Sequence, residues 1–150
     1  MKIYLASDHA GFLLKQKIKL FLEKKKIKYS DLGDFQKNKD DDYPDFVLPL
    51  AKKIVKEKNT KGIIIGGSGQ GEAMAANKIK GARAALYYGN TKKIITLSRE
   101  HNDANILALG ARFLSEKEAI DAVTLWLKTP FSHKKRHERR LKKIDALGSQ

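Results

Sequence analysis

The chain contains no cysteine among its 150 residues. A disulfide framework, a thiol nucleophile and a cysteine-based metal site are therefore excluded. It also lacks a long hydrophobic run, and Met1–Leu5 is a short strand-like segment followed at once by polar residues. We therefore expect neither a signal peptide nor a membrane span, and we expect a cytoplasmic protein.

Acidic residues are scarce relative to basic ones. The chain has 17 Asp and Glu against 31 Lys and Arg, 25 of them lysine, so its formal net charge is +14. Such a charge is typical of proteins that bind nucleic acid or membrane surfaces, or simply of a solvated lysine-rich surface. Because no aromatic-interleaved basic strand, helix-turn-helix or zinc pattern accompanies the charge, we favour the solvated surface. We predict no nucleic-acid partner and no membrane partner.

Strand-like and helix-like apolar patterns alternate along the chain. With 41% apolar residues, no internal repeat and no linker, residues 1–150 are expected to form a single domain. The predicted strands cover residues 2–6, 27–32, 62–65, 82–87 and 106–109. The predicted helices cover residues 12–26, 44–58, 71–79 and 91–99, followed by two helices capped by Ser115 and Ser132 that end near Lys128 and Leu147. This alternation predicts an α/β fold with a parallel sheet between two layers of helices.

Some local features refine these helices. Glu118 follows Ser115 by three residues, which predicts a capping box. Pro44 suits the first turn of its helix, whereas Pro49 is expected to distort that helix. The last three residues, Gly148–Gln150, are expected to be frayed and receive no role.

Polar clusters follow several predicted strands. Asp8 and His9 come after the first strand, a glycine-rich loop comes after the third, and Arg112 comes after the fifth. In parallel sheets the functional site lies at the carboxyl ends of the strands, so these groups are expected to meet. His101 precedes a strand, so this rule alone does not place it.

The glycine-rich loop is Gly66-Gly67-Ser68-Gly69-Gln70-Gly71-Glu72. A turn of this kind between strand and helix presents backbone N–H groups to an anion. It lacks the Gly-Lys-Ser/Thr ending of a P-loop and the spacing of a dinucleotide fingerprint. The unusual residue is Glu72, because a carboxylate opposes passive binding of phosphate and indicates proton chemistry beside a transient oxyanion. Glu72 is equally compatible with a structural acid in the first turn of a helix.

The other candidates also have ordinary alternatives. Asp8 suits either catalysis or a cap, and the Arg99–Asn105 segment around His101 suits either an acid–base site or a solvated loop. Arg136 and Arg140 share one helix face, as phosphate-binding arginines or as part of a basic solvated helix.

Taken together, these motifs resemble the ribose/galactose-6-phosphate isomerase family, and within it ribose-5-phosphate isomerase type B. The resemblance extends over nearly the whole chain. It rests on the segments Ile3–Gly11, Asp42–Asp45, Gly66–Glu72, Ala75–Lys78, Gly81–Arg83, His101–Asn105 and Arg136–Arg140.

The resemblance implies a Rossmann-like three-layer α/β/α fold with a five-stranded parallel sheet and a C-terminal helix that extends to a partner subunit. It implies interconversion of ribose 5-phosphate and ribulose 5-phosphate in the pentose phosphate pathway, through ring opening and a cis-enediolate, with no cofactor and no metal. A six-carbon sugar phosphate, such as allose 6-phosphate or galactose 6-phosphate, is the alternative substrate, and a basic nucleic-acid-binding module is the remote alternative. A homodimer or tetramer with a shared active site is implied as well.

The resemblance also implies roles for individual residues. Asp8 and His101 correspond to the ring-opening acid–base pair. Many members carry the proton-shuttling cysteine at the position of Gly66, so this chain resembles the subgroup that uses a glutamate, here Glu72. The residues implied to bind the enediolate oxygen and the sugar are Gly67, Ser68, Gly69, Gln70, Gly71, Tyr43 and Asn102. The residues implied to bind phosphate are His9, Arg112, Arg136 and Arg140.

The pKa of Glu72 is left open by the sequence. A helix N-terminus and nearby N–H groups lower the pKa of a carboxylate, whereas burial and an incoming phosphate raise it. A base works best when its pKa is near the operating pH.

Overall fold

Strands and helices alternate along the chain in the computed structural model, which describes residues 1–146. The elements in chain order are β1 (Lys2–Ser7), α1 (Phe12–Lys24), β2 (Tyr29–Asp31), α2 (Pro44–Lys56), β3 (Thr60–Gly66), α3 (Gln70–Ala76), β4 (Ala84–Tyr87), α4 (Lys93–Glu100), β5 (Ile106–Gly110), α5 (Glu116–Lys128) and α6 (Lys135–Ala146). Every predicted strand and helix within the described residues is present.

The five strands form one parallel sheet in the order β2-β1-β3-β5-β4. The chain leaves β1 toward β2 and then returns to β3 on the other side of β1. The carboxyl ends of β1 and β3 therefore lie side by side where the direction of winding changes, which is the usual place for a ligand crevice in an open α/β sheet. The end of β5 is the next neighbour of β3.

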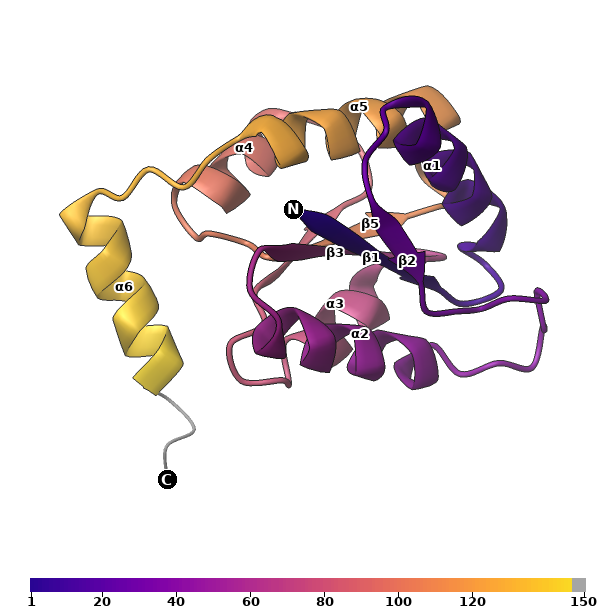
Figure 1. Ribbon diagram of the computed structural model, residues 1–150, viewed down its shortest axis with the longest axis horizontal. Coiled ribbons are helices and arrows are strands. Elements are labelled where there is room, and N and C mark those ends of the chain that lie inside the picture. Colours follow the sequence, from indigo (N-terminus) through magenta and orange to yellow (C-terminus); the bar gives the residue numbers. More distant parts are fainter. Residues whose placement is uncertain (147–150) are drawn as a thin grey trace.

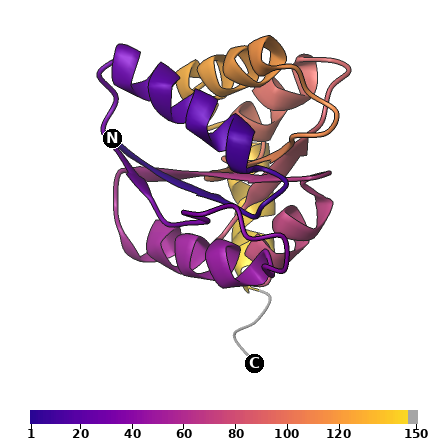
Figure 2. The same cartoon turned by 90° about the vertical axis from the view of Figure 1, so that its right-hand side faces the viewer.

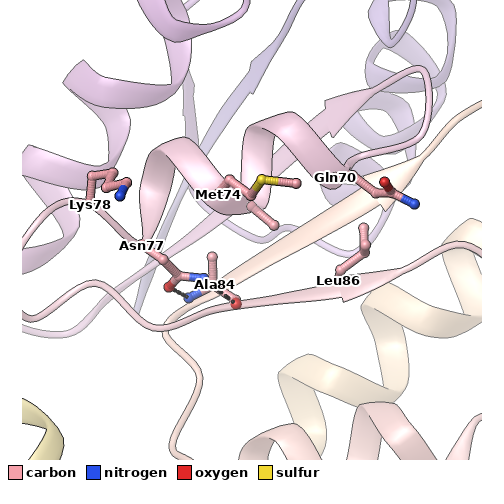
Figure 3. Close-up of a pocket in the computed structure, with 7 residues that line it drawn as sticks. Gln70, Met74, Asn77, Lys78, Ala84 and Leu86 are labelled. Carbon is pink, nitrogen blue, oxygen red and sulfur yellow. Dashed lines mark hydrogen bonds between the residues drawn. The ribbon is translucent and has the colours of Figure 1, made fainter.

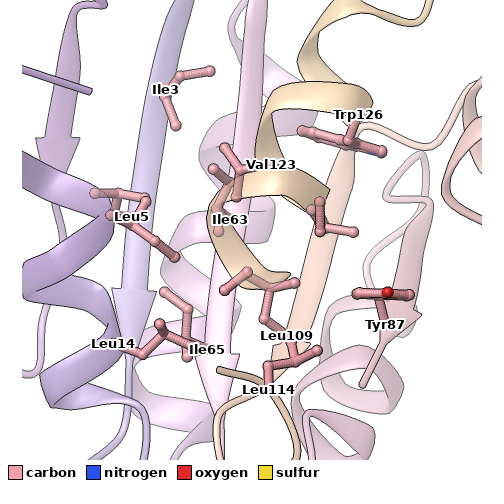
Figure 4. Packing of buried hydrophobic residues seen from close by; sticks show 14 of the residues in the cluster. Ile3, Leu5, Leu14, Ile63, Ile65, Tyr87, Leu109, Leu114, Val123 and Trp126 are labelled. Atoms are coloured by element: carbon pink, nitrogen blue, oxygen red, sulfur yellow. The ribbon is translucent and has the colours of Figure 1, made fainter. Parts of the chain in front are cut away.

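Helices cover both faces of the sheet, which confirms the three-layer α/β prediction. Helices α1, α4 and α5 lie on one face, and α2 and α3 lie on the other (Figures 1 and 2). Alternate residues of each strand enter opposite cores: in β3, Ile63 and Ile65 pack with Trp126 and Val123, whereas Ile64 packs with Leu50. Figure 4 shows the first of these cores between the sheet and α5. Successive side chains of a strand point to opposite faces of the sheet. Because helices cover both faces, the strands are apolar on both sides.

The last helix, α6, packs differently from the others. In Figure 1 it stands to one side of the three layers, beyond the amino-terminal ends of the strands. Its inward contacts are made by His137 and Leu141, which are buried, while most of its other side chains are exposed. One helix face is thus enough to hold α6 against the body of the protein.

Two helix starts test the capping predictions. Ser115 and Glu118 form the predicted capping box at α5. The cap predicted at Ser132 is wrong, because α6 begins only at Lys135 and the Ser132 hydroxyl bonds to His137 Nδ1 at 2.7 Å. A tertiary partner has replaced the local one.

Several predicted boundaries were also wrong. The strand predicted over 27–32 is shorter and covers Tyr29–Asp31, because residues before it complete the turn out of α1. The first helix ends at Lys24, since Lys26 adopts a positive φ of 54° that a helix does not allow. Helix α2 runs through Pro49, from Pro44 to Lys56, so this proline does not end the helix. Smaller shifts of one to three residues occur at other ends.

The predicted end of the last helix at Leu147 and the predicted frayed residues Gly148–Gln150 lie outside the described residues. Within residues 1–146, none of the helices combines the length and the apolar character that crossing a bilayer requires.

Candidate active site

The turn after β1 packs directly against the end of β3. A Cβ atom on Gly11 would lie 2.1 Å from the backbone oxygen of Ile65, so only glycine permits this approach. Asp8 is buried in the same turn, and its Oδ1 accepts a hydrogen bond from the Gly11 N–H at 3.0 Å. The helix N-cap itself is Gly11, so Asp8 holds the turn rather than capping α1. Its carboxylate is thereby placed beside the glycine-rich loop.

Glu72 lies in the first turn of α3, and its carboxylate folds back over the end of β3. The residue is only 3% exposed. A Cβ atom on Gly66 would lie 1.8 Å from Glu72 Oε1, so the carboxylate occupies the space that any side chain at residue 66 would need. The position of the Glu72 carboxylate therefore depends on the absence of a side chain at residue 66.

Burial decides the direction of the Glu72 pKa, which the sequence left open. Desolvation raises the pKa of Glu72 above its ordinary value, and the charge of Asp8 raises it further. A hydrogen bond from its own backbone N–H acts in the opposite direction but is outweighed by burial. A carboxylate with a raised pKa is a better proton acceptor near neutral pH than an ordinary glutamate.

The rest of the loop is enclosed by two predicted ligand-binding residues. The guanidinium of Arg112 lies over Gly67, where a Cβ would come within 3.2 Å of Arg112 Cζ. The ring of Tyr43 lies over Gly71, where a Cβ would come within 2.8 Å of Tyr43 Cζ. Gly69 has a φ of 76°, which lets the loop turn into α3. The first N–H groups of a helix have no intrahelical partner, so this turn can offer donors to an anion.

His9 also belongs to this edge of the sheet. Its Nδ1 donates to Asp41 Oδ1 at 2.5 Å, and its backbone N–H donates to Asp41 Oδ2 at 2.8 Å. The hydrogen bond to Asp41 raises the pKa of His9, against burial, which lowers it. The imidazolium form is therefore more favoured in His9 than in an ordinary histidine.

A second group of predicted site residues lies at the opposite ends of the strands, near the amino ends of β4 and β5. His101 follows α4 and precedes β5, and its ring lies 4.2 Å from that of His137 on α6. Arg136 Nε donates to His137 Nε2 at 3.1 Å. The Nε2 atom of His137 therefore accepts. Burial lowers the pKa of His137, helped by the charges of His101 and Arg136, in agreement with this acceptor role.

Asn102 and Arg140 complete this second group. Asn102 lines a hollow together with Arg83, which precedes β4, and Leu141 of α6. Arg140 is exposed on α6, one helical turn after Arg136. All these residues surround the amino ends of β4 and β5.

Within residues 1–146, the predicted site residues therefore fall into two spatially separate groups, which we call half-sites. The first half-site is defined here as Asp8, His9, Tyr43, Gly67, Ser68, Gly69, Gln70, Gly71, Glu72 and Arg112. The second half-site is defined here as His101, Asn102, Arg136 and Arg140. The strand β5 runs from the second to the first, and its five residues span roughly 16 Å. Within residues 1–146, the glycine-rich loop follows the carboxyl end of β3, whereas His101 follows α4 and precedes β5, and α6 lies beyond the amino-terminal ends of the strands (Figure 1).

Sequence reasoning missed two partners of the predicted residues. Asp41 bonds to His9, but it lies within the run Asp40-Asp41-Asp42 in a long polar loop, and nothing in that run distinguishes it. His137 stacks on His101 and lies inside the predicted arginine motif, where it received no role. Asp41 and His137 are distinguished from their sequence neighbours only by contacts with distant segments of the chain.

The fold and the first half-site define a Rossmann-like α/β protein with a buried carboxylate at a glycine-rich loop, beside cationic groups. This arrangement fits acid–base chemistry on a small anionic substrate. Residues 3–144 match the model of the family described as Ribose/Galactose Isomerase. The chain belongs to this family.

Individual relatives agree with this assignment over nearly their whole lengths. Ribose-5-phosphate isomerase B of Mycolicibacterium paratuberculosis is 43% identical over 141 residues, which cover 94% of this chain and 87% of the relative. A crystal structure of ribose-5-phosphate isomerase B from Mycoplasma genitalium with bound ribulose-5-phosphate is 42% identical, with a TM-score of 0.90 and coverage of 96% of this chain and 93% of that one. The enzyme from Clostridium thermocellum is 44% identical with a TM-score of 0.89, covering 97% and 95%.

Proposed function

We propose that this chain is an aldose–ketose isomerase that interconverts ribose 5-phosphate and ribulose 5-phosphate, with residues 1–150 as one cytoplasmic domain of the pentose phosphate pathway. The observation that carries the proposal is the buried carboxylate of Glu72, held over Gly66 beside the glycine-rich loop. The names of the relatives and the ribulose-5-phosphate bound in one of them support the pentose substrate over a hexose phosphate.

The reaction has two stages, and each half-site supplies groups to it. Asp8 and His101 open the sugar ring: one takes the proton of the C1 hydroxyl and the other delivers a proton to the ring oxygen. Glu72 then takes the proton from carbon 2, whose electron pair forms the C1–C2 double bond while the carbonyl electrons move to oxygen 1. Glu72 returns the proton to carbon 1, and the hydroxyl proton moves from oxygen 2 to oxygen 1, which leaves the carbonyl at carbon 2.

Other residues bind and stabilise the reacting molecule. The N–H groups of Gly67–Gly71 stabilise the enediolate oxygen, and loss of one such donor typically costs about 3 kcal/mol of barrier. Ser68, Tyr43 and Asn102 contact the sugar. The phosphate is bound by His9 and Arg112 of one half-site together with Arg136 and Arg140 of the other, because a dianion accepts several charge-assisted hydrogen bonds.

We infer that Glu72, rather than a residue at the end of β3, is the proton-shuttling base. The raised pKa of Glu72 suits that role, and its carboxylate lies where the side chain of residue 66 would otherwise begin. This geometry supports the glutamate subgroup of the family.

We further infer that a second copy of the chain completes the site, in a homodimer at least. The two half-sites lie at the carboxyl and the amino ends of the strands of one sheet, so the first half-site of one copy can meet the second half-site of another. The open edge strand β4 and α3 border a groove lined by Met74 and Leu86, with Met74 64% exposed (Figure 3). An apolar surface of this kind beside the first half-site is suited to a partner subunit.

Mixing two inactive variants tests the shared site. Glu72→Gln removes the first half-site and His101→Asn removes the second. If the halves come from different subunits, co-refolding equal amounts restores about a quarter of the wild-type rate, because half the dimers are mixed and each has one intact site. Absence of any recovery, with mixed dimers demonstrated by mass spectrometry, contradicts the shared site.

The function itself is tested by a coupled assay with ribose 5-phosphate and allose 6-phosphate side by side. We expect turnover of the pentose phosphate and a much lower rate with the hexose phosphate. Glu72→Gln is expected to lose nearly all turnover while substrate binding persists. Inactivity of the wild-type protein on both sugars would falsify the isomerase assignment.

A further inference from the structure

His9 and Asp41 form a closed pair at the mouth of the first half-site. The Asp41 side chain is only 5% exposed, yet both of its oxygens accept hydrogen bonds from His9, one from Nδ1 and one from the backbone N–H. The His9 ring is 30% exposed. Because Nδ1 is bound to Asp41, Nε2 is the nitrogen that the ring can offer to a ligand.

The loop that carries Asp41 is anchored at its base by buried polar contacts. Lys15 is fully buried, and its Nζ donates to Asp31 Oδ1 at 2.8 Å and to the Asp34 carbonyl at 2.6 Å. The Asp34 N–H in turn donates to the Ser7 carbonyl at the end of β1 at 2.7 Å. These bonds hold the base of the loop against β1, and the two hydrogen bonds from His9 hold Asp41 itself against the turn after that strand.

We propose that Asp41 is a positioning residue for substrate phosphate: its carboxylate fixes the His9 ring and keeps it cationic, so that Nε2–H donates to a phosphate dianion. This inference rests on the proposed function, in which His9 binds phosphate. Asp41 itself does not touch the substrate, since both of its oxygens are directed to His9.

The charges around His9 come from three segments. Asp41 reaches it from the loop, Asp8 precedes it in the turn, and Arg112 approaches from the end of β5. The hydrogen bond to Asp41 has the largest effect on the pKa of His9 and raises it; the charges of Asp8 and Asp41 also raise it, whereas burial and the Arg112 charge lower it. Removal of the Asp41 charge therefore lowers the pKa of His9, and the cation is lost at a lower pH.

The test uses Asp41→Asn, because the amide has nearly the shape of the carboxylate and its single oxygen can keep one of the two hydrogen bonds from His9 while the charge is gone. Asp40→Asn is the matched control: it makes the same charge change at the adjacent, exposed residue. Binding of inorganic phosphate is measured by calorimetry, and kcat and KM for ribose 5-phosphate by the coupled assay, from about pH 6 to about pH 9.

We expect similar phosphate affinities near pH 6. Near pH 8, Asp41→Asn should bind phosphate about tenfold more weakly and show a matching rise in KM, with kcat within about twofold, because a charge-assisted hydrogen bond has become a neutral one. Asp40→Asn should match the wild type throughout. In a His9→Asn background, adding Asp41→Asn should change phosphate binding little, because Asp41 acts through His9.

An unchanged pH profile in Asp41→Asn overturns the inference. A loss of affinity that is equal at every pH also overturns it, because such a loss indicates general loosening of the loop. An undiminished effect of Asp41→Asn in the His9→Asn background overturns it as well. Phosphate binding needs no turnover, so wild-type protein that binds phosphate with the expected pH profile but isomerises neither sugar contradicts the proposed function and not the role of Asp41.

Discussion

Gly66 and Glu72 occupy one small volume, so the change Gly66→Ala tests the proposed base without altering it. A Cβ atom at residue 66 would lie 1.8 Å from Glu72 Oε1 and 2.0 Å from Cδ, whereas ordinary contacts begin at 3.4 Å. The carboxylate must therefore retreat by about 1.6 Å. The backbone of β3 is paired with β1 up to Ile65 and with β5 through Gly66, which opposes a compensating shift of the strand.

A retreat of this size is large for catalysis. Displacement by about 1 Å can cost about 100-fold in rate, and complete loss of a general base costs about 10²- to 10⁴-fold. We expect kcat for ribose 5-phosphate to fall within that range in Gly66→Ala. KM should stay within about threefold, because the atoms nearest a Cβ at residue 66 belong to Glu72 and not to a proposed phosphate-binding residue.

The coupled assay measures both constants, and Gly62→Ala is the control. It adds the same methyl group to β3 at the other end of the strand, where the nearest atom is Leu50 Cδ2 rather than a carboxylate. The control should retain kcat even if its Tm falls. Wild-type kcat in Gly66→Ala, with Glu72 unaltered and Tm preserved, would refute the assignment of Glu72 as a base held in this position.

Four other predictions concern the charge of Glu72, ring opening by Asp8 and packing of the core. Because burial raises the pKa of Glu72, kcat should fall on the acid side at a higher pH than the pKa of an ordinary glutamate. The same shift means that ionised Glu72 destabilises the folded state, so stability present at low pH is lost as pH rises through the folded-state pKa. Glu72→Gln should therefore raise Tm at pH 7.5 but not at pH 4, as measured by calorimetry. Asp8→Asn should lose more activity with ribose 5-phosphate, which is mostly cyclic, than with ribulose 5-phosphate, which cannot close a furanose ring; equal losses argue against ring opening by Asp8. Ile18→Ala should lower the free energy of unfolding by about 2–5 kcal/mol in urea titrations at fixed protein concentration, whereas Leu20→Ala, on the exposed side of α1, should cost under about 1 kcal/mol.

Local sequence was a good guide wherever the interaction itself is local. The capping box of Ser115 and Glu118 formed as predicted, because its partners are three residues apart. Ser132 resembled a cap equally well but bonded to His137, and the strand predicted over 27–32 kept only Tyr29–Asp31. These differences arise because packing can replace one hydrogen-bond partner or strand residue with another at small cost in free energy.

The alternation of apolar periods by itself determined a parallel sheet between two helical layers, because the period of side-chain exposure follows directly from strand and helix geometry. The sequence likewise indicated a glycine-rich turn between a strand and a helix, with Glu72 in the first helical turn. Only the tertiary structure decided that burial raises the pKa of Glu72, that Asp41 pairs with His9, and that His101 and the arginines of α6 lie at the opposite ends of the strands. Desolvation and contacts between distant segments depend on where the whole chain places its groups, and no local pattern encodes them.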